Sequence, residues 1–187
     1  MTIVYFIRHA QPDHSWTADD CTRPLTIEGQ QDSKIVYEFL KDKNVDAFYC
    51  SPYKRSIDTI KDSAAFHKKE IIFDDRLRER KKGTDGNNYG MFQKRWVDKD
   101  FYEDRGESIN MVQNRNILAL EEIISKNEGS TIVVGTCHTL LNFNLIERQL
   151  INPNGISILH FIRKLLKLRR SIIWHRIMQK SILIIEI

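Results

Sequence analysis

The stretch Ile3-Val-Tyr-Phe-Ile-Arg8-His9 decides the fold that we predict for this chain. Five apolar residues in a row, all of them β-branched or aromatic, are typical of a strand that is buried on both faces. An arginine and a histidine end the run abruptly. Because open α/β sheets bind ligands beside the carboxyl ends of their strands, this strand would deliver Arg8 and His9 to such a site. A guanidinium beside an imidazole suits the holding and attack of a phosphoryl group, although two polar residues also fit an ordinary strand end.

Strands and helices alternate along the rest of the chain. Short apolar runs predict strands at residues 46–50, 71–73, 131–135 and 181–185. Apolar spacing and capping residues predict helices over about 27–41 with Thr26 as N-cap, from Ser51 and Pro52 onward, over about 107–125, and after His138. The alternation indicates βαβ units, so we predict an α/β fold with a mostly parallel sheet, in a single domain over residues 1–187.

One long segment, residues 81–106, interrupts this alternation. It is polar and rich in Gly, Asn, Asp and Lys, and we predict a surface loop there. Long loops of this kind often carry function, so this one and the loop at residues 11–24 are expected to set substrate specificity. The side chains that could touch a leaving group, or equally form plain solvated surface, are Asp13, His14, Trp16, Lys81, Lys82 and Arg95.

The composition is that of an ordinary soluble globular protein. The chain has 187 residues, of which 41% are hydrophobic and 29% are charged. Its apolar runs are far shorter than a membrane span, and its beginning does not resemble a signal peptide. The three cysteines, Cys21, Cys50 and Cys137, form no CxxC pair, and no metal-ligand spacing occurs. We therefore expect a cytoplasmic protein that works without a metal.

The positive charge is concentrated in the C-terminal part of the chain. From Arg148 to the end there are eight lysines and arginines and one acidic residue, Glu186, which leaves the first 147 residues with a net charge of −3. A basic tail could contact an acidic partner or a nucleic acid. Since no aromatic stacking pattern or binding motif accompanies it, we favour a solvated helix face and expect no nucleic-acid partner.

Polar residues follow several of the predicted strands. In a parallel sheet these strand ends share one edge, so the residues would converge into a phosphate site with an acid beside it. Taken singly, each has an ordinary explanation: a solvated helix residue, a surface ion pair with neighbouring arginines, or a structural histidine. The residues that would meet there are Arg8 and His9, Arg55 in the helix after Ser51, Glu79 within Leu77–Arg80, and His138 after the strand at 131–135.

These residues occur in motifs that resemble those of the histidine phosphatase superfamily, also called the phosphoglycerate mutase-like family. The resemblance covers residues 3 to about 139, with the motifs in the family's order. Arg8-His9-Ala10 resembles the Arg-His-Gly signature with alanine in place of glycine. The other matching segments are Leu25–Gln30, Ser51–Thr59 for Ser-Pro-x-x-Arg-x-x-x-Thr, Leu77–Glu79 for Leu-x-Glu, and Gly106–Ser108 for Gly-Glu-Ser.

The resemblance implies a three-layer α/β fold with helices on both faces of the sheet. It also implies a phosphatase that hydrolyses a small phosphomonoester without a cofactor. His9 would attack phosphorus and form a phosphohistidine, its other ring nitrogen donating a hydrogen bond to a backbone carbonyl. Arg8, Arg55 and a second histidine would bind the phosphoryl oxygens, and Glu79 would act as general acid and base.

The sequence departs from the family pattern at the second histidine and beyond. The family's Val-Gly-Thr-His-Gly-Thr corresponds here to Val134-Gly-Thr-Cys137-His138-Thr139. Without a gap Cys137 takes the histidine position; with a one-residue insertion His138 takes it, and we favour His138. After Asn152–Gly155 no family match follows, so the tail has either diverged or been misread through a shifted reading frame.

These departures leave two alternative functions open. One is a phosphoglycerate mutase, for which the chain is short and has only the 81–106 segment as an obvious lid. The other is a catalytically impaired protein that binds a phosphorylated ligand or a protein partner. The sequence predicts neither the substrate nor the oligomeric state.

Overall fold

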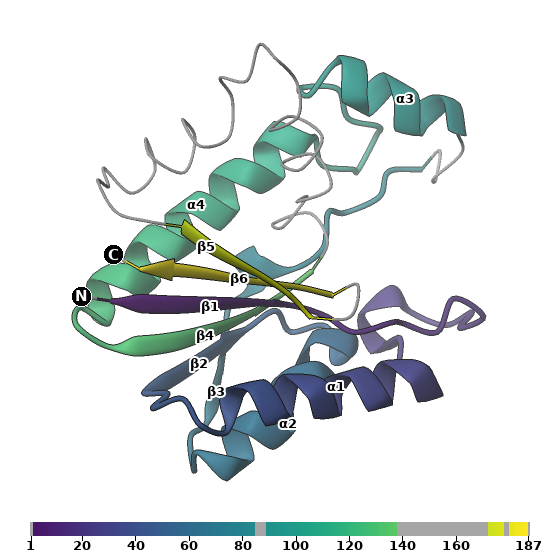
Figure 1. Ribbon diagram of the computed structural model, residues 1–187. Coiled ribbons are helices and arrows are strands. Elements are labelled where there is room, and N and C mark those ends of the chain that lie inside the picture. The colour runs from purple at the N-terminus through teal and green to yellow at the C-terminus, as the bar shows by residue number, and fades with distance from the viewer. Residues whose placement is uncertain (1, 85–88, 138–171, 178–179, 187) are drawn as a thin grey trace.

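The computed structural model describes residues 2–84, 89–137, 172–177 and 180–186. A six-stranded sheet with the order β3-β2-β4-β1-β6-β5 forms its centre (Figure 1). The strands are β1 (Ile3–Arg8), β2 (Ala47–Cys50), β3 (Ile71–Phe73), β4 (Thr131–Thr136), β5 (Ile172–Ile177) and β6 (Lys180–Glu186). Among the described residues, no helix has the length and apolar character needed to cross a membrane.

The sheet is parallel in its first four strands and antiparallel at one edge. Parallel pairs join β1 to β4, β4 to β2 and β2 to β3. β6 runs antiparallel to β1, and β5 runs antiparallel to β6. The α/β fold and the last strand at 181–185 are therefore confirmed. β5 was not predicted, and the described parts of the basic tail are strands and not the helix face that the sequence favours.

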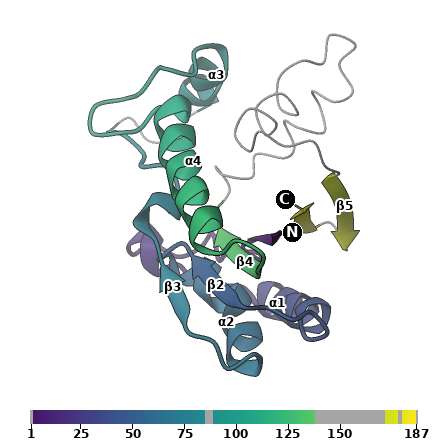
Figure 2. The same cartoon turned by 90° about the vertical axis from the view of Figure 1, so that its left-hand side faces the viewer.

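Helices cover both faces of the sheet, which gives three layers (Figure 2). The helices α1 (Ile27–Leu40) and α2 (Lys54–Phe66) lie on one face, and α4 (Ile109–Lys126) lies on the other. Alternate residues of β1 serve the two sides: Tyr5 packs with the α1 and α2 side chains, while Val4 packs with those of α4. The first apolar run is thus a strand buried on both faces, as its composition predicts.

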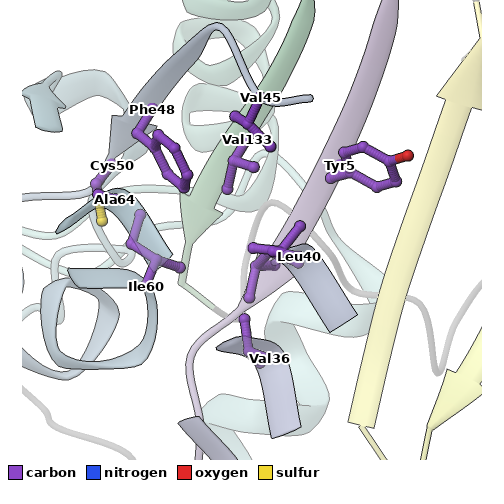
Figure 3. Close-up of a cluster of buried hydrophobic side chains, with 10 residues drawn as sticks. Tyr5, Val36, Leu40, Val45, Phe48, Cys50, Ile60, Ala64 and Val133 are labelled. Carbon is purple, nitrogen blue, oxygen red and sulfur yellow. The ribbon is translucent and has the colours of Figure 1, made fainter. Parts of the chain in front are cut away.

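The core on the α1 and α2 side is built of aliphatic and aromatic side chains from two helices and three strands. Figure 3 shows Val36 and Leu40 of α1 and Ile60 of α2 directed toward Val133 and Phe48 of the sheet. Leu40, Ile60, Phe48 and Val133 have no exposed surface. Burial of this extent contributes about 1.5–3 kcal/mol for each large aliphatic or aromatic side chain, before entropy costs are counted. This core fixes α2 against the sheet, and with it the residues at its first turn.

The carboxyl ends of the parallel strands are level with one another. Arg8 pairs with Thr136 across β1 and β4, and the His9 N–H donates to the Thr136 carbonyl at 3.1 Å. On the other side of β4, the Ser51 N–H donates to the Gly135 carbonyl at 2.9 Å. Residues that directly follow β1, β2 and β4 therefore meet at one edge, as the predicted topology requires.

The Leu-Thr-x-x-Gly segment has a local physical explanation. The Thr26 hydroxyl accepts a hydrogen bond from the Gly29 N–H at 3.0 Å, which confirms Thr26 as the N-cap of α1. A Cβ atom at position 29 would lie 2.3 Å from the carbonyl oxygen of Gln11. Gly29 therefore allows the start of α1 to pass close beneath the loop that follows His9.

Two predictions are wrong: Ser51 as the cap of α2, and a loop throughout residues 81–106. Ser51 does not cap α2, because its N–H still extends the sheet ladder; α2 begins at Lys54 with Tyr53 in the cap position. Residues 81–106 are not loop throughout, since Tyr89–Val97 form α3. Contacts with the segment after the helix, from Arg95 to Glu103 and from Lys94 to the Phe101 ring, stabilise α3, and composition does not reveal them. The helix predicted after His138 lies outside the described residues.

Candidate active site

His9 lies directly after β1, and its tautomer follows from one contact. The Nδ1 atom is 2.8 Å from the carbonyl oxygen of Ala10. A carbonyl oxygen only accepts, so in the neutral ring Nδ1 carries the hydrogen and Nε2 keeps its lone pair. Burial lowers the pKa of His9, and the cations Arg55 and Arg8 lower it further. The hydrogen bond to the Ala10 carbonyl opposes this shift, and the resulting pKa is about 4. His9 is therefore neutral at pH 7, with a free lone pair on Nε2.

Arg55 is buried at the first turn of α2, and four groups surround its guanidinium. Its side chain is only 4% exposed. Nη1 donates to the Asp20 carbonyl at 2.8 Å, and Nη2 lies 3.3 Å from Asp20 Oδ2 and 3.8 Å from Glu79 Oε2. The Tyr53 ring lies under the guanidinium carbon at 4.7 Å. These contacts fix the orientation of a permanent cation next to His9.

Glu79 brings a carboxylate to the same place. Besides its approach to Arg55, its Oε1 accepts a hydrogen bond from the Arg80 N–H at 3.1 Å. Its negative charge also raises the pKa values of His9 and Arg8, against the larger effect of burial, so Glu79 lies near both. Among the neighbouring arginines, the guanidinium groups of Arg76 and Arg78 pair with other carboxylates, whereas the Glu79 charge acts on Arg80 as well as on Arg55.

Arg8 is the second cation of the site. Burial lowers the pKa of Arg8, and the nearby Glu79 carboxylate opposes that shift. An arginine remains charged under all ordinary conditions, so the site holds two permanent cations beside a neutral imidazole. Of the predicted site residues, the structure thus brings together Arg8, His9, Arg55 and Glu79.

A charged network anchors the backbone at Glu79. The Glu79 carbonyl accepts hydrogen bonds from Arg78 Nη1 and from Arg115 Nη2, each at 3.2 Å. Both arginines also donate to the carboxylate of Glu107, at 2.7–3.1 Å, and the Lys81 N–H donates to it at 2.8 Å. Burial raises the pKa of Glu107, but these bonds outweigh burial and lower the pKa to about 2. Glu107 therefore remains ionised and holds both arginines.

Cys137 lies at the end of β4, and its side chain is buried. Its Sγ lies 3.4 Å from Ser51 Oγ and 3.3 Å from Ser56 Oγ. Burial raises the pKa of Cys137, so the thiol is uncharged at neutral pH. Unlike a protonated histidine, a thiol supplies no positive charge for a phosphoryl oxygen. His138, the favoured second histidine, lies outside the described residues.

Several side chains that bear on the site were missed by sequence reasoning. The only sequence signals for them were the position of Glu107 in the Gly-Glu-Ser segment and of Thr59 in Ser-Pro-x-x-Arg-x-x-x-Thr. Arg95, a candidate for contact with the leaving group, is buried and pairs with Glu103, whereas Lys81 and Lys82 are exposed. The missed residues are Asp20, Tyr53, Thr59, Glu107 and Arg115.

The site contains the components of a phosphotransfer reaction: a neutral imidazole, cations for phosphoryl oxygens and a carboxylate. Within residues 2–84, 89–137, 172–177 and 180–186, no group of three His, Cys, Asp or Glu side chains is arranged to hold a metal ion. A comparison of the sequence with known families matches residues 4–155 to the histidine phosphatase superfamily (branch 1). The chain belongs to this superfamily. Its membership makes the protein a phosphatase or phosphotransfer enzyme.

Solved structures of other proteins show the same fold. A His-to-Ala mutant of phosphoserine phosphatase from Entamoeba histolytica, in complex with phosphoserine, has 21% identity and a TM-score of 0.66, with 98% of this chain and 95% of that chain covered. YhfR of Bacillus stearothermophilus has 21% identity and a TM-score of 0.66, with 97% and 94% covered. Mycobacterial glucosyl-3-phosphoglycerate phosphatase has 18% identity and a TM-score of 0.66, with 82% and 81% covered. A search of curated proteins found no match.

Proposed function

We propose that this histidine phosphatase hydrolyses a small phosphomonoester through a phosphohistidine intermediate on His9. The observation that carries the proposal is the neutral His9 ring, whose Nδ1–H is bonded to the Ala10 carbonyl and whose Nε2 is free to attack. Two buried or partly buried arginines beside it suit the oxygens of a phosphoryl group.

In the first step the Nε2 lone pair of His9 forms a bond to phosphorus while the bond from phosphorus to the leaving oxygen breaks. Arg8 and Arg55 bind the phosphoryl oxygens and stabilise the charge that spreads over them in the transition state. Protonated Glu79 donates its proton to the leaving oxygen, so that an alcohol departs. The contact of Glu79 with Arg55 supports this assignment, because it keeps the carboxyl group beside the phosphoryl site.

In the second step Glu79, now a carboxylate, accepts a proton from water. The water oxygen bonds to phosphorus, the bond between phosphorus and Nε2 breaks, and inorganic phosphate leaves. His9 returns to its neutral Nδ1–H form and Glu79 to its protonated form, so the cycle closes without a co-reactant. His138 would add a further donor to the phosphoryl oxygens if it takes the second-histidine position.

The relatives support a phosphatase more than a mutase. The phosphatases named above act on phosphoserine and on glucosyl-3-phosphoglycerate, which are small phosphorylated metabolites. A mutase must shield its phosphohistidine from water and hold one substrate in two orientations. In the described residues, only the segment that contains α3 resembles a covering element.

The test is to trap the intermediate with a radiolabelled phosphate ester of a good leaving group, such as nitrophenyl phosphate. We expect an acid-labile, alkali-stable label on the native protein, none on His9→Ala, and full labelling of His67→Ala. His67 is a suitable control because it lies at the other end of α2, bonded to the Leu40 carbonyl. Absence of label on the native protein at every pH would overturn the proposal and favour a ligand-binding protein without turnover.

A second measurement separates phosphatase from mutase. The native protein is incubated with phosphoglycerate, and free phosphate and the isomeric product are followed together. We expect phosphate without isomer, or no reaction if phosphoglycerate is not a substrate. Isomer without phosphate release would favour the mutase.

A further inference from the structure

A chain of three hydrogen bonds connects the ring of His9 to the backbone of Arg55 through the side chain of Thr59. His9 Nδ1 donates to the Ala10 carbonyl at 2.8 Å. The Ala10 N–H donates to the Thr59 hydroxyl oxygen at 3.0 Å. The same hydroxyl donates to the Arg55 carbonyl at 2.7 Å. One side chain thus bonds both to Ala10, next to His9, and to Arg55.

The direction of each bond is fixed by its partners. The Arg55 carbonyl can only accept, so the single hydroxyl hydrogen of Thr59 points toward it. The Ala10 N–H can only donate, so it uses a lone pair of the same oxygen. Thr59 is 3% exposed and Ala10 is 4% exposed, so water does not readily substitute for either bond. The hydroxyl therefore holds the peptide group between His9 and Ala10 in one orientation.

We propose that Thr59 is a positioning residue that sets the reactive tautomer of His9. By holding the Ala10 N–H, it fixes the peptide group between His9 and Ala10. The Ala10 carbonyl, which belongs to the next peptide group, starts from this fixed position and reaches His9 Nδ1, so that the lone pair stays on Nε2. With the opposite tautomer, a ring lone pair would face a carbonyl lone pair, and Nε2 would carry a hydrogen and could not attack phosphorus. The function assigned to Thr59 rests on the proposed nucleophilic role of His9.

The spacing within α2 explains why Thr59 can bond to both Ala10 and Arg55. Thr59 lies four residues after Arg55, so its hydroxyl reaches the Arg55 carbonyl one turn back. The same turn faces the loop after β1, where Ala10 lies. A serine could make both bonds, whereas a valine would keep the shape of threonine and leave the buried Ala10 N–H without its partner.

The experiment compares Thr59→Val with Thr59→Ser by two readouts. Nitrogen-15 NMR of histidine-labelled protein reports the tautomer of His9, whose signals are assigned by their absence in His9→Ala. We expect native protein and Thr59→Ser to hold the Nδ1–H form, and Thr59→Val to shift toward Nε2–H, the form that free imidazole side chains prefer. In parallel, phosphohistidine formation should slow about tenfold or more in Thr59→Val and stay close to native in Thr59→Ser.

Ser63→Ala is a matched control. Ser63 lies one turn further along α2 and is equally buried, and its hydroxyl has no hydrogen-bond partner among the described residues. We expect its substitution to leave the His9 tautomer unchanged. If Thr59→Val does not fold, Thr59→Cys replaces it, because a thiol is a weaker donor and acceptor, and a partial shift toward Nε2–H is expected.

A folded Thr59→Val or Thr59→Cys protein that keeps the Nδ1–H form would overturn the proposal. This result is distinguishable from a failure of the proposed function. If His9 never becomes phosphorylated, the catalytic assignment fails, yet the NMR comparison still shows whether Thr59 determines the tautomer.

Discussion

The two sides of the phosphoryl site are held by different kinds of interaction. On the nucleophile side, His9 is fixed through Ala10 and Thr59 by hydrogen bonds in which no partner except the imidazole itself can ionise. On the acid side, the backbone at Glu79 is fixed by Arg78 and Arg115, which the Glu107 carboxylate holds in turn. Salt and pH should therefore disturb the acid side through its supports, and the nucleophile side mainly through His9.

The difference matters because the two sides have different tasks. In the proposed mechanism His9 must keep a lone pair on Nε2. The uncharged groups of Ala10 and Thr59 hold the ring in place without adding a charge of their own. In the proposed mechanism Glu79 gains and loses a proton in each cycle, and the ionised network that holds its backbone stays unchanged meanwhile. Glu107 suits this task because its pKa of about 2 keeps it charged at neutral pH.

The largest effect is expected from Glu79→Gln, which tests whether the two sides act in separate steps. Glutamine keeps the shape of the side chain but cannot donate or accept the transferred proton, so kcat should fall by about 10²–10⁴. With a good leaving group the first step needs little acid help, so phosphohistidine should accumulate on His9. Rapid-quench measurement of the labelled enzyme checks this, and an unchanged kcat would remove Glu79 from the mechanism.

The next largest effect is expected from Glu107→Gln, which removes the carboxylate that holds Arg78 and Arg115 on the acid side. Glu107 accepts five hydrogen bonds from Arg78, Arg115 and the Lys81 N–H. In Glu107→Gln an amide group would face some of these donors. Arg115 would lose the counter-charge of Glu107, and Arg78 would keep only the exposed Asp75 among the carboxylates that pair with it in the described residues. We expect the free energy of unfolding to fall by about 2–4 kcal/mol in denaturant titrations, since one partner of a partly buried ion-pair network is removed.

Glu122→Gln is the control for that measurement. Glu122 also pairs with an arginine and a lysine, Arg76 and Lys126, but on the surface, so its loss should leave stability nearly unchanged. Equal effects of the two substitutions would contradict the special role assigned to the Glu107 network.

Acid should destabilise the two sides in different pH ranges. His9 has a pKa of about 4 in the folded protein and near 6.5 when unfolded, so the unfolded chain binds the proton first as the pH falls from 6.5 to 4, and stability decreases there. Glu107 has a pKa of about 2 folded and near 4.5 unfolded, so its stabilisation is complete above pH 4.5 and is lost as the pH falls toward 2.

Unfolding free energies measured across pH in the native protein and in two variants check this order. His9→Ala should reduce the loss of stability between pH 6.5 and 4, and Glu107→Gln should reduce the loss between pH 4.5 and 2. If the two variants flatten the same range, the proposed division between the sides is wrong.

The sequence predicted the parts of the site that depend on short spacing. The position of His9 follows from an apolar strand that ends at the sheet edge, and the position of Arg55 follows from a helix that starts just after β2. The four parallel strands follow from apolar runs that core packing requires. In each case the signal lies within a short stretch of sequence, even though the strands that pair, such as β1 and β4, lie far apart in the chain.

The supports of the site depend on residues far apart in the chain, which spacing does not reveal. Glu107 lies 29 residues from Arg78, and Asp20 lies 35 residues from Arg55. Their pairing follows from how the loops return to the sheet edge, which is determined only in the folded chain. α3 was missed for a different reason: Arg95 pairs with Glu103 only eight residues later, but this contact depends on how the segment after the helix folds back, which composition does not reveal.

The smallest effect is expected at Asp20, which places a carboxylate against the nucleophile side. Its Oδ2 lies 3.3 Å from Arg55 Nη2 and its Oδ1 lies 2.8 Å from Arg23 Nη2. Asp20 holds Arg55 mainly through its backbone carbonyl, which no side-chain substitution removes. Asp20→Asn should therefore leave Arg55 in place while it removes a negative charge that opposes an incoming phosphate.

Inorganic phosphate should bind Asp20→Asn about threefold to tenfold more tightly, which corresponds to about 1 kcal/mol of relieved repulsion at this partly exposed carboxylate. Asp62→Asn makes the same change in net charge on the exposed face of α2 and should leave phosphate affinity as it is. Isothermal titration with phosphate at low ionic strength measures both. Weaker binding in Asp20→Asn would mean that the carboxylate, and not only the carbonyl, holds Arg55, so that the nucleophile side also depends on an ion pair.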